Sequence, residues 1–530
     1  MNKMIININD VSFAYSDMKD NLFEEVEFSI YSGDRIGLLG FNGSGKSTIL
    51  DIIKGLKMPE SGEVRRLSEN IFYLKQEDYA VGELSILDYL MSGRPKLHNL
   101  YKEIIDIEKQ GIQDPIKYAK LIGEFGELGG YEFIHTIKKT TDKFGFPDEA
   151  LERSVDNLSG GERRLLKLAS GFIDNHNLFL LDEPTNYLDD EGIEFLINAI
   201  NSSNSAFLIV CHDRWFLDGS VDKILEIAER KIREYKGGFS LFFNTKQNEL
   251  KEKLRKKKKI ESEIKHLKEI ERSYKVWGKR KEKEKIGAGD KGFISHRAAK
   301  LMKRSIQSKE RIQKRIEELK ETKPYIEKWY EFRFEEVSIH SGSCLTVNRL
   351  EKSMSGKLLF KEFGFTVGCG EKVAILGPNG SGKTTLLEII QSKLTPDEGE
   401  VIWSGKTAIG YLPQKWDSVD DEKEVSKLFQ KSQWQMAMTL MGCLKVKGDN
   451  FYKRLGELSE GQKRKVKLVK LIMDEPNVLV LDEPTTHLDY MTVGILEKAL
   501  QDFKGTIIMV THDKFLRDRV SEREIYIRKG

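Results

Sequence analysis

Cysteine is scarce in this chain, and long apolar runs are missing. The four cysteines among the 530 residues are Cys211, Cys344, Cys369 and Cys443, and they form no CxxC pair. They predict neither a zinc site nor an iron–sulfur cluster, and they fit a reducing compartment. No segment approaches the roughly 18–20 consecutive apolar residues of a membrane helix. The N-terminal residues show no apolar signal-peptide core. We expect a cytoplasmic protein without membrane segments.

A large charge of either sign is also missing, because 87 Lys and Arg residues against 84 Asp and Glu residues leave a net charge of +3. Such a balance by itself argues against a nucleic-acid partner. The distribution is uneven, however. Residues 251–320 hold 26 basic and 11 acidic residues, a net of +15, while the rest of the chain holds 61 and 73, a net of −12. A basic segment therefore interrupts an acidic protein.

The clearest organisational feature is an internal repeat. The copies lie 337 or 338 residues apart near their start and 300 apart later, so the first copy contains 38 extra residues. The repeated pairs are Gly40–Thr48 with Gly377–Thr385, Gln76 with Gln414, Leu158–Glu162 with Leu458–Gln462, Leu181–Asp189 with Leu481–Asp489, and Val210–Asp213 with Val510–Asp513.

The repeat predicts two α/β domains, at residues 1–243 and 331–530, joined by a linker at 244–330. The extra residues fall at about 92–131 and read as two short amphipathic helices; a tolerated surface insertion is the plain alternative. The linker has apolar residues at helical spacing on both sides of a Gly-containing break, Ile286–Phe293. This pattern predicts an antiparallel helical hairpin.

Each copy contains the pattern GxxxxGK[ST] between an apolar strand and an apolar helix, which predicts a phosphate-binding loop. Backbone N–H groups and the positive end of the helix would hold phosphates. Lys46 and Lys383 would reach the β- and γ-phosphates, and Ser47 and Thr384 would bind Mg²⁺. The other residues predicted to bind ATP here are Gly40, Asn42, Gly43, Ser44, Gly45, Thr48, Gly377, Asn379, Gly380, Ser381, Gly382 and Thr385.

Two apolar strands end in Asp182-Glu183 and Asp482-Glu483. The aspartates suit Mg²⁺ binding, and the glutamates stand where a carboxylate could polarise an attacking water. A similar sequence, Met473–Pro476, follows a helical pattern, so we interpret it as the loop before the second of these strands.

Ser159 and Ser459 precede basic, leucine-rich helices as natural N-caps. The first turns of these helices would form an anion site.

Together these motifs resemble the nucleotide-binding domain of ABC ATPases. In that family two domains pack head to tail, and each ATP lies between the phosphate loop of one and the signature of the other. The resemblance implies catalytic roles for Glu183, Glu483, His212 and His512, and roles for Gln76 and Gln414 at the Mg²⁺ and ATP. It adds as ATP-binding residues Tyr15, Ser159, Gly160, Gly161, Glu162, Ser459, Gly461 and Gln462.

The two copies differ where the family pattern is strict. Tyr15 matches the aromatic residue that stacks on adenine, whereas the offset of 337 places Lys352 at that position in the second copy. Glu460 replaces the first signature glycine, which brings a carboxylate near phosphates and predicts unequal sites.

Two such domains joined by a basic hairpin resemble the ABC-F group of translation factors. This resemblance implies a monomer that binds the 70S ribosome at the vacant tRNA exit site. Its hairpin would contact 23S rRNA and the P-site tRNA. The long linker and Leu458–Gln462 resemble the antibiotic-resistance members, which protect the ribosome from lincosamides, pleuromutilins and streptogramin A. A general factor that rescues stalled ribosomes is the alternative, and the ATPase subunit of a membrane exporter is a remote one.

The linker offers side chains suited to RNA. A lysine run is usually a solvated face, but attached to this ATPase pair it favours contact with phosphates. Aromatic residues near the break could stack on bases. The predicted RNA contacts are Lys256, Lys257, Lys258, Lys259, Tyr274, Trp277, Lys279, Arg280 and Phe293.

Overall fold

The computed structural model describes residues 3–16, 20–76, 80, 82–284, 307–308, 310–322, 334, 342–354, 356–405, 407–414 and 421–527, and the side chains of 274–284 and 357 are not described. The chain divides into two units. One contains Met1–Ser240 together with Tyr330–Gly530, and the other contains Leu241–Trp329. Both copies of the repeat thus belong to the first unit.

A mainly parallel sheet forms the centre of the first copy, in the order β5-β6-β7-β3-β8-β9, with β9 antiparallel to β8. Every residue of β6 and β7 is buried, as strands covered on both faces require. The strands are β3 (Arg35–Gly40), β5 (Ile71–Leu74), β6 (Leu178–Asp182), β7 (Ala206–Val210), β8 (Lys223–Ala228) and β9 (Lys231–Lys236).

The second copy repeats this sheet in the order β14-β15-β16-β12-β17. Helix α13 ends at Met473 and β15 begins at Val478, so Asp474, Glu475 and Pro476 lie in the loop before the strand, as predicted, while Met473 is the last residue of the helix. The strands are β12 (Lys372–Leu376), β14 (Ile409–Leu412), β15 (Val478–Asp482), β16 (Thr506–Val510) and β17 (Arg523–Tyr526).

Each copy also has an antiparallel sheet, β2-β1-β4 and β11-β10-β13. Its register corrects one sequence expectation. Phe13 pairs with Phe23, and Lys352 pairs with Phe360. Phe23 and Phe360 are equivalent, since they lie 337 residues apart, so their partners Phe13 and Lys352 are equivalent too. Lys352 therefore corresponds to Phe13 and not to Tyr15, because the connection between the two paired strands differs in length between the copies. The strands are β1 (Met4–Phe13), β2 (Phe23–Tyr31), β4 (Ser61–Arg66), β10 (Ser343–Met354), β11 (Lys357–Gly368) and β13 (Glu398–Trp403).

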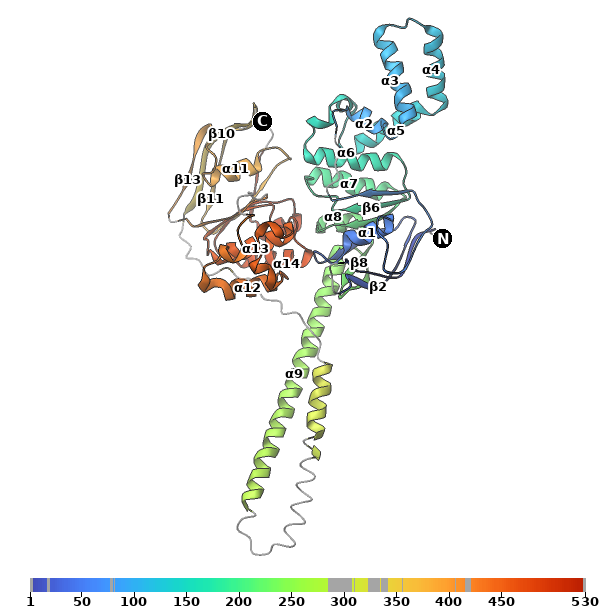
Figure 1. Ribbon diagram of the computed structural model, residues 1–530. Coiled ribbons are helices and arrows are strands. Elements are labelled where there is room, and N and C mark those ends of the chain that lie inside the picture. Colours follow the sequence, from blue (N-terminus) through green and yellow to red (C-terminus); the bar gives the residue numbers. More distant parts are fainter. Residues whose placement is uncertain are drawn as a thin grey trace. The chain divides into compact units, whose positions relative to one another are not determined.

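Both copies also contain helices (Figure 1). In the first they are α1 (Lys46–Lys54), α2 (Ile86–Met91), α3 (Pro95–Gln110), α4 (Pro115–Glu127), α5 (Gly130–Lys143), α6 (Gly160–Ile173), α7 (Asp190–Ser202) and α8 (Arg214–Ser220). In the second they are α11 (Lys383–Ile390), α12 (Trp434–Cys443), α13 (Glu460–Met473), α14 (Tyr490–Asp502) and α15 (Lys514–Val520).

The extra residues of the first copy form α3 and α4, which confirms two helices in this insertion. They lie side by side and extend away from the sheets (Figure 1), and Lys117 Nζ of α4 lies 2.6 Å from Glu103 Oε1 of α3. Ile104, Leu121 and Phe125 are buried, and the Tyr101 and Phe125 rings lie 6.1 Å apart. Proline at the first turn of each helix needs no N–H partner, so it fits both starts.

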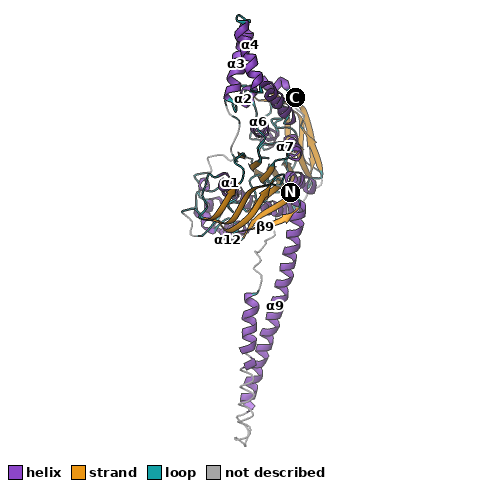
Figure 2. Ribbon diagram, turned by 90° about the vertical axis from the view of Figure 1, so that its right-hand side faces the viewer, coloured by secondary structure: helices purple, strands orange, loops and turns teal. Residues whose placement is uncertain are grey.

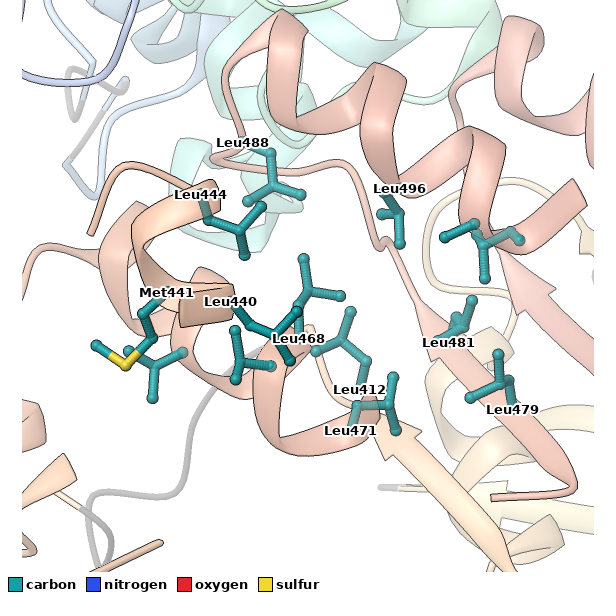
Figure 3. Packing of buried hydrophobic residues seen from close by; sticks show 14 of the residues in the cluster. Leu412, Leu440, Met441, Leu444, Leu468, Leu471, Leu479, Leu481, Leu488 and Leu496 are labelled. Carbon is teal, nitrogen blue, oxygen red and sulfur yellow. The ribbon is translucent and has the colours of Figure 1, made fainter. Parts of the chain in front are cut away.

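A leucine-rich cluster joins the helical part of the second copy to its sheet (Figure 3). Leu440 and Met441 from α12 and Leu468 from α13 pack with Leu479 and Leu481 from β15. All five side chains are buried. This packing connects the helix that follows Ser459 to the strand that ends in Asp482, so two parts of a site are anchored in one core.

The second unit contains most of α9 (Phe239–Glu284), a single helix of 46 residues (Figure 2). At ~1.5 Å per residue it is ~70 Å long. Residues 310–321 are also helical, and Arg315 Nη2 lies 3.3 Å from Glu263 Oε1 of α9. The break Ile286–Phe293 lies outside the described residues. No helix in the described ranges is long and apolar enough to cross a membrane.

Candidate active sites

Both phosphate loops run from a buried strand into a helix. Gly45 and Gly382, which precede α1 and α11, have φ values of 94° and 92°. This left-handed conformation favours glycine. Lys46 Nζ donates to the carbonyls of Gly40 and Phe41 at 2.9 and 3.1 Å, so its ammonium group lies inside the loop. Lys383 Nζ donates in the same way to Gly377 and to Pro378.

Burial lowers the pKa of Lys46 and of Lys383, because it removes each ammonium group from water. The negative charge of a bound phosphate chain would stabilise both buried ammonium groups. Both lysines therefore lie where the motif predicts them, in loops suited to a polyanion.

The hydroxyl groups that follow these lysines face the strand-end aspartates. Thr384 Oγ1 donates to Asp482 Oδ2 at 2.9 Å. Burial raises the pKa of Asp182, and a hydrogen bond from Ser47 opposes that rise. Burial, followed by the charge of Glu483, raises the pKa of Asp482 to about 6. A hydroxyl and a carboxylate in contact are hard oxygen ligands, so each pair fits Mg²⁺ next to ATP phosphates.

Each strand-end glutamate faces a histidine. Glu183 Oε1 lies 3.5 Å from His212 Nε2, and Glu483 Oε1 lies 3.5 Å from His512 Nε2. The glutamates have φ values of 50° and 47°. The backbone N–H of Glu183 donates to the carbonyl of Val210, and that of Glu483 donates to the carbonyl of Val510; each valine ends the strand before the loop that carries the histidine. Burial and the charge of Asp182 raise the pKa of Glu183 to about 8. These carboxylates can act as general bases.

Two buried arginines hold these catalytic strand ends. Arg164 Nη2 donates to the carbonyls of Asp182 and Glu183 at 2.9 and 3.1 Å. Arg464 donates in the same way to Asp482, at 2.8 Å, and to Glu483. Both lie on the helix that follows the capping serine. The two arginines lie 300 residues apart, which is the offset of the later repeated motifs. That offset could have identified them from the sequence, although neither belongs to a recognised motif.

The serines before α6 and α13 are N-caps, as predicted. Ser159 Oγ accepts from the Glu162 N–H at 3.3 Å, and Glu162 Oε2 accepts from the Ser159 N–H at 2.8 Å. Ser459 and Gln462 form the same reciprocal capping box. The side chains of Glu162 and Gln462 are therefore bonded to their own caps, and the serines and glycines of each first turn remain available to phosphate.

Each phosphate loop contacts the other copy of the repeat. Asn42 Nδ2 donates to the His487 carbonyl at 2.9 Å, and Asn379 Nδ2 donates to the Tyr187 carbonyl at 2.8 Å. A Cβ atom on Gly461 would lie 2.5 Å from Asn42 Nδ2, and one on Gly161 would lie 3.1 Å from Asn379 Nδ2. The signature glycines thus leave room for the opposite loop.

Two head-to-tail sites follow from these contacts. We call the site of Lys46 and Glu183, faced by Ser459–Gln462, the first site. The second site contains Lys383 and Glu483 and is faced by Ser159–Glu162. Asp189 Oδ2 also accepts from the Asn379 N–H, at 3.1 Å. Asp489 instead lies 2.5 Å from the buried Lys465 Nζ, for which the first copy has Leu165.

Other residues that join the copies gave little signal in the sequence. The buried Arg214 guanidinium pairs with Glu497 at 2.6 Å and with Asp513 at 3.1 Å. The Tyr490 hydroxyl donates to Glu226 Oε1 at 2.7 Å. The repeat preserves neither residue, because Lys514 stands at the position of Arg214 in the second copy and Asp190 stands at the position of Tyr490 in the first. Single-copy contacts of this kind cannot be found by matching one copy to the other.

The remaining predicted site residues have simpler surroundings. The Tyr15 hydroxyl lies 2.9 Å from Thr48 Oγ1, and Lys57 Nζ donates to it at 3.0 Å. Gln76 and Gln414 follow β5 and β14, the strands beside those that end in Asp182 and Asp482. Both glutamines therefore stand at the carboxyl edge of their sheets, where the other site residues are.

The predicted RNA contacts are described only in part. Lys256, Lys258 and Lys259 are exposed on α9, and Lys257 is half-buried. The side chains of Tyr274, Trp277, Lys279 and Arg280 lie outside the described residues, as does Phe293.

The sequence matches the family described as ABC transporter at residues 23–186 and 360–486, once in each copy. It is 31% identical to the ribosome protection protein VmlR of Bacillus subtilis, over 99% of this chain and 87% of the relative. It is 30% identical to ABC transporter F family member 2 of Arabidopsis thaliana, over 99% of this chain and 76% of the relative. This chain belongs to the ABC-F family.

A third relative of this ABC-F chain is the energy-dependent translational throttle protein EttA of Escherichia coli, at 30% identity over 95% of the chain and 88% of the relative. Among solved structures, the archaeal ribosome recycling factor aABCE1 matches with a TM-score of 0.56 at 18% identity, over 98% of this chain and 87% of that one. That likeness supports the fold. Family membership and the two sites together make this ABC-F protein an ATPase.

Proposed function

We propose that this ATPase binds the 70S ribosome in its ATP-bound state and protects it from antibiotics of the peptidyl-transferase centre, of the lincosamide, pleuromutilin and streptogramin A type. The observation that carries the proposal is the combination of two ATP sites completed across the repeat with a long basic helix, α9. The name of the Bacillus subtilis relative supports the protective role.

In this proposal, ATP binding and hydrolysis determine when the protein binds the ribosome and when it leaves. Each phosphate loop faces the signature of the other copy, so bound ATP would join the copies and hydrolysis would release them. Mg²⁺ would be held by Ser47, Asp182 and Gln76 in the first site, and by Thr384, Asp482 and Gln414 in the second. The metal would neutralise phosphate charge as it develops. The catalytic carboxylates would orient the attacking water, and His212 and His512 would stay near the γ-phosphate.

The linker supplies the contact with RNA. We propose that residues 244–330 form a hairpin between ATPase domains at 1–243 and 331–530, and that it enters the ribosome from the tRNA exit site. The net charge of +15 over residues 251–320 suits the phosphates of 23S rRNA and P-site tRNA. The protein would act in the cytoplasm as a monomer, since its two copies complete each other.

Co-sedimentation with ribosomes tests the binding step. Glu183→Gln combined with Glu483→Gln should be retained on 70S ribosomes with ATP, because hydrolysis can no longer release it. The same protein without nucleotide serves as the control. A double variant that stays in the supernatant with ATP would contradict ribosome binding.

Neutralising the lysine run tests the RNA contact. Replacing Lys256, Lys257, Lys258 and Lys259 by Gln should weaken ribosome binding and flatten its salt dependence, by about 0.7–0.9 in logarithmic slope for each phosphate that the linker no longer neutralises. ATP binding should be unchanged. A matched control neutralises four exposed lysines of the second copy, Lys427, Lys431, Lys447 and Lys453. Equal losses of affinity in both variants would show that overall charge, and not the linker, drives binding.

A general translation factor is the second candidate, and the similarity to EttA favours it. Expression in a drug-susceptible bacterial host separates the two. Protection predicts a higher inhibitory concentration of a lincosamide or pleuromutilin, and this increase should disappear in the double Glu→Gln variant. Ribosome binding without any change in tolerance would favour the general factor.

A further inference from the structure

The residue that follows the repeated aspartate differs between the copies, and it lies beside a catalytic histidine. Asp190 is the first residue of α7 in the first copy. Its Oδ1 lies 3.1 Å from His512 Nδ1, and its Oδ2 accepts from Arg517 Nη1 at 3.2 Å. His512 Nε2 faces Glu483 Oε1 at 3.5 Å, and the backbone N–H of His512 donates to Glu483 Oε2 at 3.2 Å. The imidazole is thus held between carboxylates of two copies.

The first site has no such arrangement among the described residues. Its corresponding residue is Tyr490, whose hydroxyl donates to Glu226 and whose ring stacks on Phe41 at 6.4 Å. His212 Nδ1 is buried, and no hydrogen-bond partner for it exists in the described part of the chain. His212 therefore faces Glu183 at the same distance as its counterpart, but nothing described orients its other nitrogen.

We propose that Asp190 is a positioning residue for the second site: contributed by the first copy, it holds His512 through Nδ1 so that Nε2 faces Glu483 and the γ-phosphate. A histidine is oriented by the hydrogen bond of its second nitrogen, which also decides where the ring carries its proton. The second site is complete only when α7 of the first copy lies against the loop that carries His512.

Electrostatics agree with this geometry. Burial opposes protonation of His512, but the Glu483 carboxylate and the bond to Asp190 raise its pKa. Burial and the charge of Lys46 lower the pKa of His212 to about 3. The second site therefore presents a more cationic imidazole to phosphate than the first. Unequal turnover at the two sites follows from Asp190 and Tyr490, beyond the difference at Glu460.

Steady-state ATP hydrolysis tests the proposal in backgrounds that leave one catalytic glutamate. In Glu183→Gln, where the second site remains, Asp190→Ala should lower kcat about tenfold with little change in KM, a size typical of residues that orient a functional histidine. Asp190→Asn keeps an acceptor for Nδ1 and should recover part of the activity. In Glu483→Gln, where the first site remains, the decrease on Asp190→Ala should be several-fold smaller. Equal decreases in both backgrounds would overturn the proposal.

Glu191→Ala is the matched control, because it removes one exposed carboxylate from the same helical turn. Its kcat should remain that of the background. A drop equal to that of Asp190→Ala would mean that charge at the start of α7, and not the contact with His512, is responsible.

Histidine-selective ¹⁵N spectra of the full chain give a readout independent of turnover. The signal of His512, assigned by its disappearance in His512→Gln, should show a protonated Nδ1 that changes on Asp190→Ala and not on Glu191→Ala. An unchanged His512 spectrum in Asp190→Ala would overturn the proposal even where a background variant has no measurable turnover. The proposal depends on ATP hydrolysis alone, so it does not fall if ribosome binding is disproved.

Discussion

The strongest test of how the two copies are joined is the removal of Arg214. Its side chain is 3% exposed and forms ion pairs with Glu497 and Asp513, which are 8% and 9% exposed. Arg214→Ala would leave two buried carboxylates without their shared cation. Breaking a buried pair in this way costs about 3–5 kcal/mol.

The lower end of that range is expected here. Glu497 keeps a second cation, because Arg519 Nη1 lies 2.6 Å from its other oxygen. Asp513 keeps the Leu516 N–H, which donates to it at 3.0 Å as the first turn of α15 is capped. A loss of about 3 kcal/mol corresponds to a fall in Tm of about 6–12 °C for a domain of 150–250 residues.

The repeat provides a matched control, since Lys514 occupies the position of Arg214 in the second copy. Its side chain is 25% exposed and pairs at 3.4 Å with Glu194, which is 58% exposed. Lys514 Nζ also lies 3.4 Å from the centre of the Trp215 ring. Lys514→Ala should therefore cost only about 1 kcal/mol.

Differential scanning calorimetry of both variants at one pH and salt concentration measures the difference. A double-mutant cycle of Arg214→Ala with Glu497→Ala should give a coupling free energy above about 1.5 kcal/mol. If Arg214→Ala lowered Tm no more than Lys514→Ala, or if the cycle were additive, the buried ion pairs would not join the copies as argued.

Two further predictions concern the sites themselves. The pKa of Glu183 is about 8, above its ordinary value of 4.5, so between those pH values the folded chain holds a proton that the unfolded chain has released. The free energy of unfolding therefore decreases as the pH rises from 4.5 to about 8. Nucleotide-free Glu183→Gln should thus gain several degrees in Tm over wild type at pH 8.5 but little at pH 5 by scanning fluorimetry; an equal gain at both would refute the shift. Gly461→Ala would place Cβ 2.5 Å from Asn42 Nδ2 and 2.7 Å from the His487 carbonyl, so ATPase activity should fall at least tenfold. Gly442→Ala, whose Cβ meets nothing within 4 Å, should keep full activity.

Much of each half-site could be predicted from residues that are close in the sequence. The phosphate loops, Asp182, Glu183, the capping serines and the α3–α4 insertion are local: each depends on a strand, turn or helix formed by its own segment. Periodicity and turn chemistry suffice for such elements. The correspondence of Lys352 failed because a constant offset cannot follow a change in the length of the β1–β2 connection.

The contacts across the repeat could not be derived in the same way. Asn42 with His487, and Arg214 with Glu497, join residues that lie 445 and 283 positions apart. Nothing in either segment indicates the other. Arg164 and Arg464 could be predicted in part. Their equivalent positions in the two copies can be read from the sequence, but their hydrogen bonds to the carbonyls at the strand ends cannot.

The sequence by itself determined that two phosphate-binding ATPase domains flank a basic helical linker, because those features depend on local patterns and on charge counts. Only the tertiary structure decided that the sites are unequal beyond Glu460. Asp190 and Tyr490 occupy the same place in the repeat, yet one lies beside His512 and the other bonds Glu226. That difference depends on which side chains of the opposite copy each one meets, and packing, not spacing, sets those neighbours.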